Sequence, residues 1–129
     1  MKYVYPAIFT EEQNGQYSVV FPDFVNCYTS GDSLAEAIEM AEDVLVLTLY
    51  DMEEDNQPIP KASDISSIKS DSIVSLIACD TMEYRKLYDN KAVKKTLTIP
   101  NWLNTEAEKR DINFSSVLKE ALMEKIKVC

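Results

Sequence analysis

The chain has 129 residues, which is enough for one modest domain or two small ones. Its hydrophobic content of 46% allows a folded core and argues against wholesale disorder. It contains no histidine, which excludes a Ser-His-Asp triad, a Cys-His pair and any His-ligated metal within one chain.

The cysteines and the N-terminal sequence indicate the compartment. Cys27, Cys79 and Cys129 are odd in number and widely spaced, so we expect reduced thiols and neither disulfides nor a zinc site. No apolar run approaches the roughly 20 residues needed to span a bilayer. The opening MKYVYPAIFTEE lacks the apolar stretch and cleavage site of a signal peptide. We therefore expect a cytoplasmic protein without membrane contact.

Charge divides the chain into two parts. Residues 1–90 hold five basic and 17 acidic residues, a net charge of −12, whereas residues 91–129 hold eight basic and five acidic residues, a net charge of +3. Such asymmetry favours contact with a polyanion at the basic end, although a solvated helical surface explains the same count.

The acidic part begins like a β-meander. The predicted strands are 3–10, 17–21 and 26–29, with a turn at Asn14-Gly15 between the first two. Pro6 lacks a backbone donor, which favours an edge position for the first strand.

A helix follows, because Ser33 and Glu36 form the S-x-x-E pattern of a capping box. Its apolar residues recur at three- and four-residue steps and are predicted to share one face: Leu34, Ile38, Ala41, Leu45 and Leu49. Residues 44–50 are apolar nearly all round, which favours burial from more than one side over an exposed stripe that binds a partner.

The next segments complete the first domain. Residues 53–70 read as a loop, residues 72–79 as a continuous apolar run typical of a central strand, and residues 81–89 as a short helix. Asp89-Asn90 looks like the joint between domains. We therefore predict domains 1–90 and 91–129.

The basic domain shows strand, helix and helix. Within KKTLTIP (94–100), Leu97 and Ile99 alternate with Thr96 and Thr98, a period of two. Pro100 ends this strand, and a helix is predicted over 101–110. After a turn at Asp111-Ile112 comes a second amphipathic helix, with Asn113 as its N-cap.

A lone strand and two short helices cannot close a core or satisfy the strand's backbone. Pairing two copies would solve both problems with an antiparallel ribbon over four helices. The predicted dimer core comprises Leu97, Ile99, Trp102, Val117, Leu118 and Leu122. A two-stranded ribbon fits the DNA major groove. The outward side chains predicted to contact base edges are Lys94, Thr96 and Thr98, and the residues predicted to offer a helix N-terminus to a phosphate are Asn113, Ser115 and Ser116.

The segment KKTLTIPNWLNTEAEKRDINFSSVLKEAL resembles the ribbon-helix-helix family of bacterial repressors. The resemblance implies the same roles for Lys94, Thr96 and Thr98 as base readers. Asp111 stands where that family often has glycine, and aspartate tolerates a left-handed backbone. An ordinary amphipathic helical hairpin is the alternative interpretation of this segment.

The first domain resembles the HicB antitoxins. The matching motifs are Tyr5-Pro6-Ala7, Tyr17-Ser18-Val19, Pro22-Asp23, Cys27 to Ala37 and Pro58-Ile59-Pro60. Val25-Asn26 stands where many members carry Pro-Gly. The resemblance implies an α+β protein: a partial RNase H-like β-meander plus helix, followed by a dimeric ribbon-helix-helix domain. It also implies that the chain binds and inhibits a small RNA-cleaving HicA toxin and represses its own operon at operator DNA.

Two other functions compete with this one. A metal-dependent, RNase H-like nuclease would use carboxylates at strand ends such as Asp23 and Asp80, but the strands offer too few inward acids. A stand-alone ribbon-helix-helix repressor would sense a ligand with its first domain. We expect no catalytic residue, metal or cofactor. The expected partners are a basic HicA-type toxin, bound by acids that the sequence does not single out, operator DNA, and a second copy of the chain, with assembly into higher oligomers left open.

Overall fold

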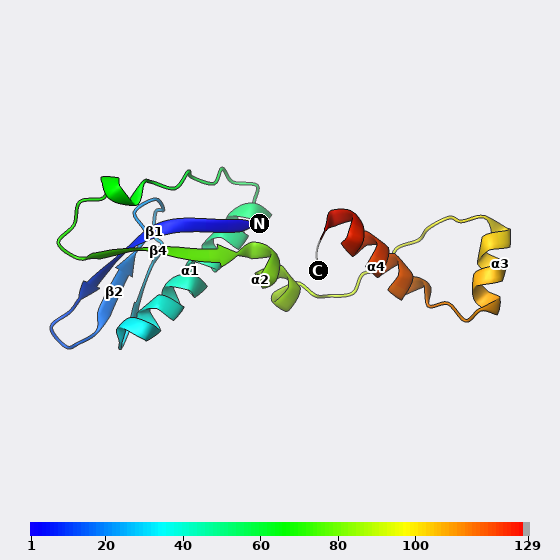
Figure 1. The fold of residues 1–129 in the computed structure, drawn as a ribbon, viewed down its shortest axis with the longest axis horizontal. Helices are drawn as coiled ribbons and strands as arrows, with labels where there is room; N and C mark the ends of the chain where they lie inside the picture. The colour runs from blue at the N-terminus through cyan, green and yellow to red at the C-terminus, as the bar shows by residue number, and fades with distance from the viewer. Residues whose placement is uncertain (128–129) are drawn as a thin grey trace. The chain divides into compact units, whose positions relative to one another are not determined.

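The computed structural model describes residues 1–127 and divides the chain into two units, Met1–Lys91 and Ala92–Cys129. The expectation about the Cys129 thiol falls outside the described residues. Each unit is described by itself below, and Figure 1 traces the chain through both.

The N-terminal unit is built on a four-stranded sheet in the order β3-β2-β1-β4. The strands are β1 (Lys2–Glu11), β2 (Tyr17–Val20), β3 (Tyr28–Gly31) and β4 (Ile73–Asp80), and every neighbouring pair is antiparallel. The long helix α1 (Leu34–Glu54) lies across one face of this sheet (Figure 1). This is an α+β arrangement, as the sequence predicted.

β4 is an edge strand, which corrects the prediction of a central strand for residues 72–79. Its apolar run reflects two different environments. Ile77 is buried on the face that α1 covers, whereas Leu76 on the opposite face keeps 51% of its surface exposed. A continuous apolar run therefore does not require two covered faces, and the outer face of this sheet remains apolar and accessible.

Pro6 is buried in β1, which has a strand on both sides over part of its length. β2 pairs only with residues 8–11 of β1, and β4 pairs with residues 2–9. At Pro6 the strand therefore has one neighbour, β4, so the missing N–H falls where β1 is locally an edge. The predicted edge position is correct for this half of β1 and wrong for the other half.

β3 begins two residues later than predicted. Asn26 adopts a left-handed backbone with φ +62°, and the amide of Phe21 donates to the carbonyl of Cys27 at 3.0 Å. This tight connection uses residues 22–27, so ladder pairing with β2 begins only at Tyr28. Sequence patterning misses the shift because an asparagine in the left-handed region leaves no hydrophobic signal.

α1 begins at the predicted cap, where the Ser33 hydroxyl accepts the amide hydrogen of Glu36 at 3.1 Å. Its buried residues are Ala37, Ala41, Leu45 and Leu49, whereas Leu34 and Ile38 are exposed, contrary to prediction. The first turn passes so close to β3 that only small side chains fit between them. The buried face therefore begins with alanines, and the larger residues beside them point outward.

The core of this unit lies between α1 and the sheet. Aromatic and aliphatic side chains of the strands, including Tyr5, Phe9 and Val19, pack there with Phe21 and the buried face of α1. The polypeptide then returns through a long connection containing a short 3-10 helix, η1 (Ile65–Ser67). The hydroxyl of Tyr5 donates to the carbonyl of Pro60 and fastens that connection to the sheet.

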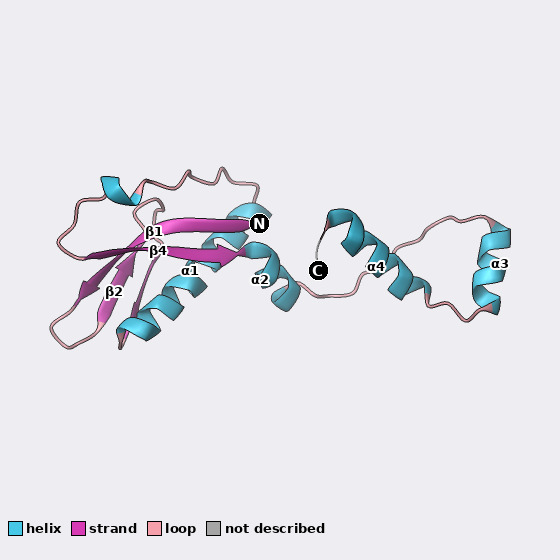
Figure 2. Ribbon diagram, viewed as in Figure 1, coloured by secondary structure: helices cyan, strands magenta, loops and turns pink. Residues whose placement is uncertain are grey.

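Helix α2 (Thr81–Tyr88) closes the N-terminal unit, and the second unit contains α3 (Asn101–Lys109) and α4 (Phe114–Ile126). All three lie where the sequence predicted helices. Asp111, between α3 and α4, is left-handed with φ +52°, which agrees with its place where glycine is frequent. Residues 89–100 form no regular secondary structure in the single chain, so the described strands all precede residue 81 (Figure 2).

Candidate functional site

The C-terminal unit has almost no core of its own. Among its described residues, 92–127, Ala107 is the only buried one. Trp102 keeps 69% and Leu97 keeps 56% of their surface exposed, and Ile99, Val117 and Leu122 are also exposed, while Leu118 is half-buried. Five of the six residues predicted to form a dimer core are thus uncovered apolar surface, and the sixth, Leu118, is covered only in part. A unit in this state gains most of its hydrophobic stabilisation only when something covers that surface.

The predicted base readers Lys94, Thr96 and Thr98 are exposed within the segment that has no regular structure. A β-strand needs a neighbour to accept and donate its backbone hydrogen bonds, and one copy of this unit supplies none. The structure of one chain therefore neither forms the ribbon nor excludes it, and the ribbon stays a prediction.

The start of α4 is organised by its cap. The Asn113 side-chain carbonyl accepts the amide hydrogen of Ser116 at 3.1 Å, and the backbone carbonyl of Asn113 accepts that of Val117. Of the residues predicted to bind phosphate, Ser116 therefore already donates its backbone N–H to the Asn113 side chain, and this donor is not free for an anion. An anion at this helix end would use the amides of Phe114 and Ser115, which the helical pattern does not employ, and the hydroxyls of the two serines.

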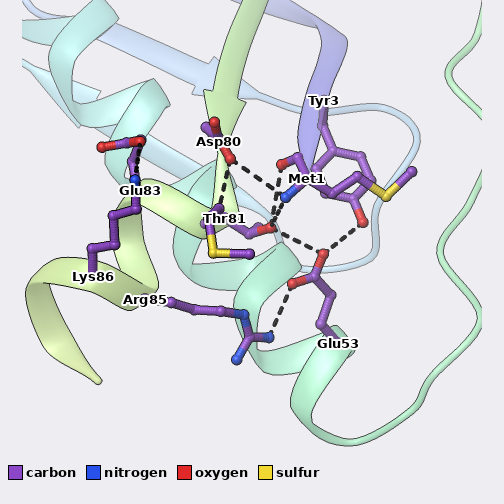
Figure 3. Close-up of polar contacts among 9 residues, drawn as sticks. Met1, Tyr3, Glu53, Asp80, Thr81, Glu83, Arg85 and Lys86 are labelled. Atoms are coloured by element: carbon purple, nitrogen blue, oxygen red, sulfur yellow. Dashed lines mark hydrogen bonds and ion pairs between the residues drawn. The ribbon is translucent and has the colours of Figure 1, made fainter. Parts of the chain in front are cut away.

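A polar cluster in the N-terminal unit joins β1, α1 and α2 around Glu53 (Figure 3). One Glu53 oxygen accepts hydrogen bonds from the Tyr3 hydroxyl at 2.7 Å and from the Thr81 hydroxyl at 3.0 Å. The other oxygen accepts from the guanidinium of Arg85 at 3.0 Å, and Arg85 also contacts Glu54. Sequence reasoning missed this cluster because its members, from Tyr3 to Arg85, are up to 82 residues apart in the chain.

The electrostatics of the cluster follow from these contacts. Burial alone would raise the pKa of Glu53, but the hydrogen bonds from Tyr3, Arg85 and Thr81 outweigh it and lower that pKa. Burial, together with the Glu53 carboxylate, raises the pKa of Tyr3 to about 12. The Glu54 and Glu53 carboxylates raise the pKa of Arg85 above its ordinary value. The cluster therefore holds the Glu53 carboxylate and the Arg85 guanidinium in fixed positions, with the Glu54 carboxylate beside them.

The two carboxylates weighed as metal ligands have other partners. Asp23 accepts the amide hydrogen of Ser63 at 3.0 Å and its hydroxyl, and so fastens the long connection. Asp80 caps α2 by accepting the amide hydrogen of Met82 at 2.9 Å. Within residues 1–127, no three His, Cys, Asp or Glu side chains gather as a metal ion would require.

A groove of about 660 Å³ runs between α1, the end of β4 and α2, and we call it the α1–α2 groove. Its apolar lining is supplied mainly by Val46, Leu47, Tyr84, Leu87 and Tyr88, and its carboxylates are Glu42, Asp43, Asp80 and Glu83. Leu47 is exposed, so the prediction that residues 44–50 are buried from several sides is wrong at this position. The sequence did carry a signal for this groove. Tyr84, Leu87 and Tyr88 recur at helical spacing and therefore share one apolar face of the short helix α2.

Comparison with known proteins assigns the family. The model of the HicB_like antitoxins of bacterial toxin-antitoxin systems matches residues 5–121. An uncharacterised 14.9 kDa protein of Haemophilus phage HP1 is 30% identical over 102 residues, which is 75% of this chain and 73% of the phage protein. Antitoxin HicB of Escherichia coli K12 is 42% identical over 64 residues, which is 49% of this chain and 46% of that antitoxin, so the match spans about half of it.

The solved structures agree. A chain of a toxin-antitoxin complex from Streptococcus pneumoniae is 31% identical and superimposes with a TM-score of 0.63, covering 97% of this chain and 99% of that chain. No helix of the described residues has the length and apolar character needed to cross a membrane. The sequence motifs, the antiparallel sheet under one long helix and these matches lead to the same conclusion: the chain belongs to the HicB-like antitoxin family of bacterial toxin-antitoxin systems.

Proposed function

We propose that this chain is an antitoxin with two separate activities. Its N-terminal unit binds and blocks a small basic HicA-type toxin that cleaves RNA, and its C-terminal unit forms a homodimer that binds operator DNA and represses the operon. The solved relative from Streptococcus pneumoniae is part of a toxin-antitoxin complex, which supports the first activity. In this proposal the N-terminal sheet and helix form a partial RNase H-like fold, and the location is the cytoplasm.

The observation that carries the second activity is the uncovered apolar surface of the C-terminal unit. With Ala107 its only buried residue in the described range, this unit lacks the burial that would stabilise it alone. A second copy covers Leu97 and Trp102 and gives residues 94–99 a strand to pair with. The resulting ribbon presents Lys94 and its neighbouring threonines to base edges.

The charge distribution explains the first activity. A toxin that holds RNA needs a basic surface, and residues 1–90, with a net charge of −12, approach such a surface rapidly. Blocking requires only that the antitoxin cover the surface used by RNA. The proposal therefore needs no catalytic residue, metal ion or cofactor in this chain.

A truncation tests the division of labour. The chain ending before Lys91 and the full chain are each co-expressed with the toxin and assayed for co-purification, rescue of growth and gel retardation of operator DNA. We expect the truncated chain to keep toxin binding and lose DNA binding. Retardation of the operator by the truncated chain would show that the units do not divide the work in this way.

The dimer is tested by Leu97→Lys, which places a charge in the proposed core. We expect light scattering to show the mass of a monomer, because a buried unpaired charge is expensive. Val20→Lys is the matched control, since it adds the same charge to the exposed outer face of the N-terminal sheet. An unchanged mass for Leu97→Lys would refute the inward orientation of Leu97.

Base reading is tested with two neighbouring lysines, Lys94 and Lys95, whose side chains point to opposite faces of the proposed strand. Lys94→Ala is expected to weaken binding to the operator by about 1–3 kcal/mol while leaving binding to random DNA nearly unchanged. Lys95→Ala, on the opposite side of the strand, controls for the loss of one positive charge. Equal losses on operator and random DNA would assign Lys94 to a phosphate contact.

The alternative of a stand-alone repressor that senses a ligand makes a different prediction. In that case the full chain would retard its operator, respond to a small molecule, and fail to co-purify with or neutralise the toxin. The match to a chain of a toxin-antitoxin complex over nearly its whole length favours the antitoxin.

A further inference from the structure

We propose that the α1–α2 groove is the place where the N-terminal unit holds its toxin. The groove would receive an apolar side chain of the toxin, and the carboxylates on its rim would pair with the lysines or arginines around that side chain. This inference rests on the proposed antitoxin function and assigns it to one surface of the unit.

The groove has the apolar character of a protein-binding site. Leu87 and Tyr88 keep 75% and 73% of their surface exposed, and Leu47 on α1 is exposed as well. These side chains line one continuous hollow of about 660 Å³, which is within the range of volumes that accommodate a bound group. Tyrosine is among the residues that contribute most to binding at protein interfaces. Contact with a partner would remove this surface from water.

The charge of the groove selects the class of partner. Its lining includes Glu42, Asp43, Asp80 and Glu83, and no lysine or arginine is among the described residues that line it. Asp80 is engaged at the start of α2, and Glu83 forms an exposed pair with Lys86 at 3.3 Å. Glu42 and Asp43 therefore carry most of the attraction for a cationic partner. The same charges repel the phosphates of RNA and DNA, so a basic protein surface fits the groove and a nucleic acid does not.

The groove is also held in shape before any partner binds. Arg85 joins α2 to Glu53 and Glu54 of α1, and its guanidinium carbon lies 4.6 Å from the ring centre of Tyr50. The rings of Tyr50 and Tyr84 are 4.8 Å apart between their centres, which adds a second link between the helices. A preformed site loses little conformational freedom on binding, so more of the contact energy appears as affinity.

Affinity measurements on the full chain test the inference, with the HicA-type toxin of the same operon, inactivated as an RNase, as the probe. Leu87→Ser removes an exposed apolar side chain of the groove, and Glu42→Lys reverses a charge on its rim. Each is expected to weaken toxin binding by at least about tenfold, as at an interface hot spot. Leu76→Ser and Asp71→Lys make the same chemical changes at exposed positions outside the groove and are expected to leave affinity within about twofold.

Hydrogen exchange on the wild-type complex provides a second measurement that needs no variant. We expect the toxin to protect the amides of α2 and of the middle of α1, around residues 42–47, and to leave the outer face of the sheet unprotected. Normal affinity of both groove variants, or protection of the outer face around Leu76 instead, would overturn the inference while leaving the antitoxin function intact. Failure of the wild-type chain to bind the toxin would instead refute the proposed function, and the inference with it.

Discussion

Gly31 offers the sharpest test of how β3 and α1 fit together. A Cβ atom at this position would lie 2.5 Å from the backbone nitrogen of Ala37, 2.7 Å from its Cα and 2.9 Å from the carbonyl carbon of Glu36. Non-bonded heavy atoms are comfortable at about 3.5 Å, so the shortest of these contacts is too close by about 1 Å. All three atoms belong to the helix backbone, and no side-chain rotation can relieve the clash.

Gly31→Ala therefore forces β3 and the first turn of α1 apart. Overpacking of this kind costs about 1–3 kcal/mol. The displaced turn carries Ala37, the first buried residue of α1, so the separation loosens the start of the helix–sheet contact. For a domain of this size, each kcal/mol lowers the melting temperature by about 4–8 °C. We expect the N-terminal unit of the variant to melt about 5–20 °C below that of the wild type.

The two units can be followed separately in the full chain. Far-UV circular dichroism reports the secondary structure of both units, whereas the fluorescence of Trp102, the only tryptophan, reports the second unit, so a transition seen in the first signal alone belongs to the N-terminal unit. The variant should shift the first transition and leave the second in place. Ser30→Ala, on the neighbouring exposed residue of β3, should change stability by no more than about 0.5 kcal/mol. If Gly31→Ala melts like the wild type, the close approach of β3 to α1 is wrong.

Three further predictions follow from individual contacts. Because the folded-state pKa of Glu53 lies below its ordinary value of 4.5, its contribution to stability is present above that pH and is lost as pH falls through the folded-state value. Glu53→Gln should therefore destabilise the N-terminal unit at neutral pH by about 1–3 kcal/mol. As the pH is lowered, the urea midpoint of the variant should fall less steeply than that of the wild type. Parallel dependence of the two urea midpoints on pH would contradict this. Asn113→Ala removes the cap of α4 and should lower the stability of the C-terminal unit by about 0.5–2 kcal/mol. A urea titration followed by Trp102 fluorescence measures this loss, and an unchanged midpoint would show that the cap is dispensable. Burial, reinforced by Asp80, raises the pKa of the Cys79 thiol to about 11. Site-resolved mass spectrometry should therefore show that iodoacetamide labels Cys79 much more slowly than it labels glutathione at neutral pH. Labelling at the rate of glutathione would count against the half-buried position of Cys79.

The distribution of burial over the chain explains why one protein of this length needs two units. The largest fully buried side chains of the described residues all belong to the N-terminal unit, most of them to its strands and to α1. The C-terminal unit instead leaves its tryptophan, leucines and isoleucines in contact with water. The first unit can be stable as a monomer, whereas the second, in the function proposed above, is stabilised by a further copy. Under that proposal, toxin binding and DNA binding can be lost independently by mutation.

Local patterns were sufficient to predict most of the helices and their caps. Ser33 and Asn113 are the N-caps expected for α1 and α4, because a cap depends only on residues within one helical turn. Asp111 is left-handed, as a turn between two amphipathic helices suggested. The motifs around Tyr5, Pro22-Asp23 and Cys27 were sufficient to indicate the family, which the match over residues 5–121 confirms.

Contacts between distant segments could not be read from local patterns. The edge position of β4, the close approach of Gly31 to Ala37 and the gathering of Tyr3, Glu53 and Arg85 all depend on which segments meet after folding. The α1–α2 groove arises for the same reason, since its two walls are more than 30 residues apart. The sequence by itself determined the helices, the caps, the charge asymmetry and the family, because each is set by neighbouring residues or by a recognisable motif. Only the tertiary structure decided which apolar residues are covered and which carboxylates surround an open surface, because burial depends on the packing of the whole unit.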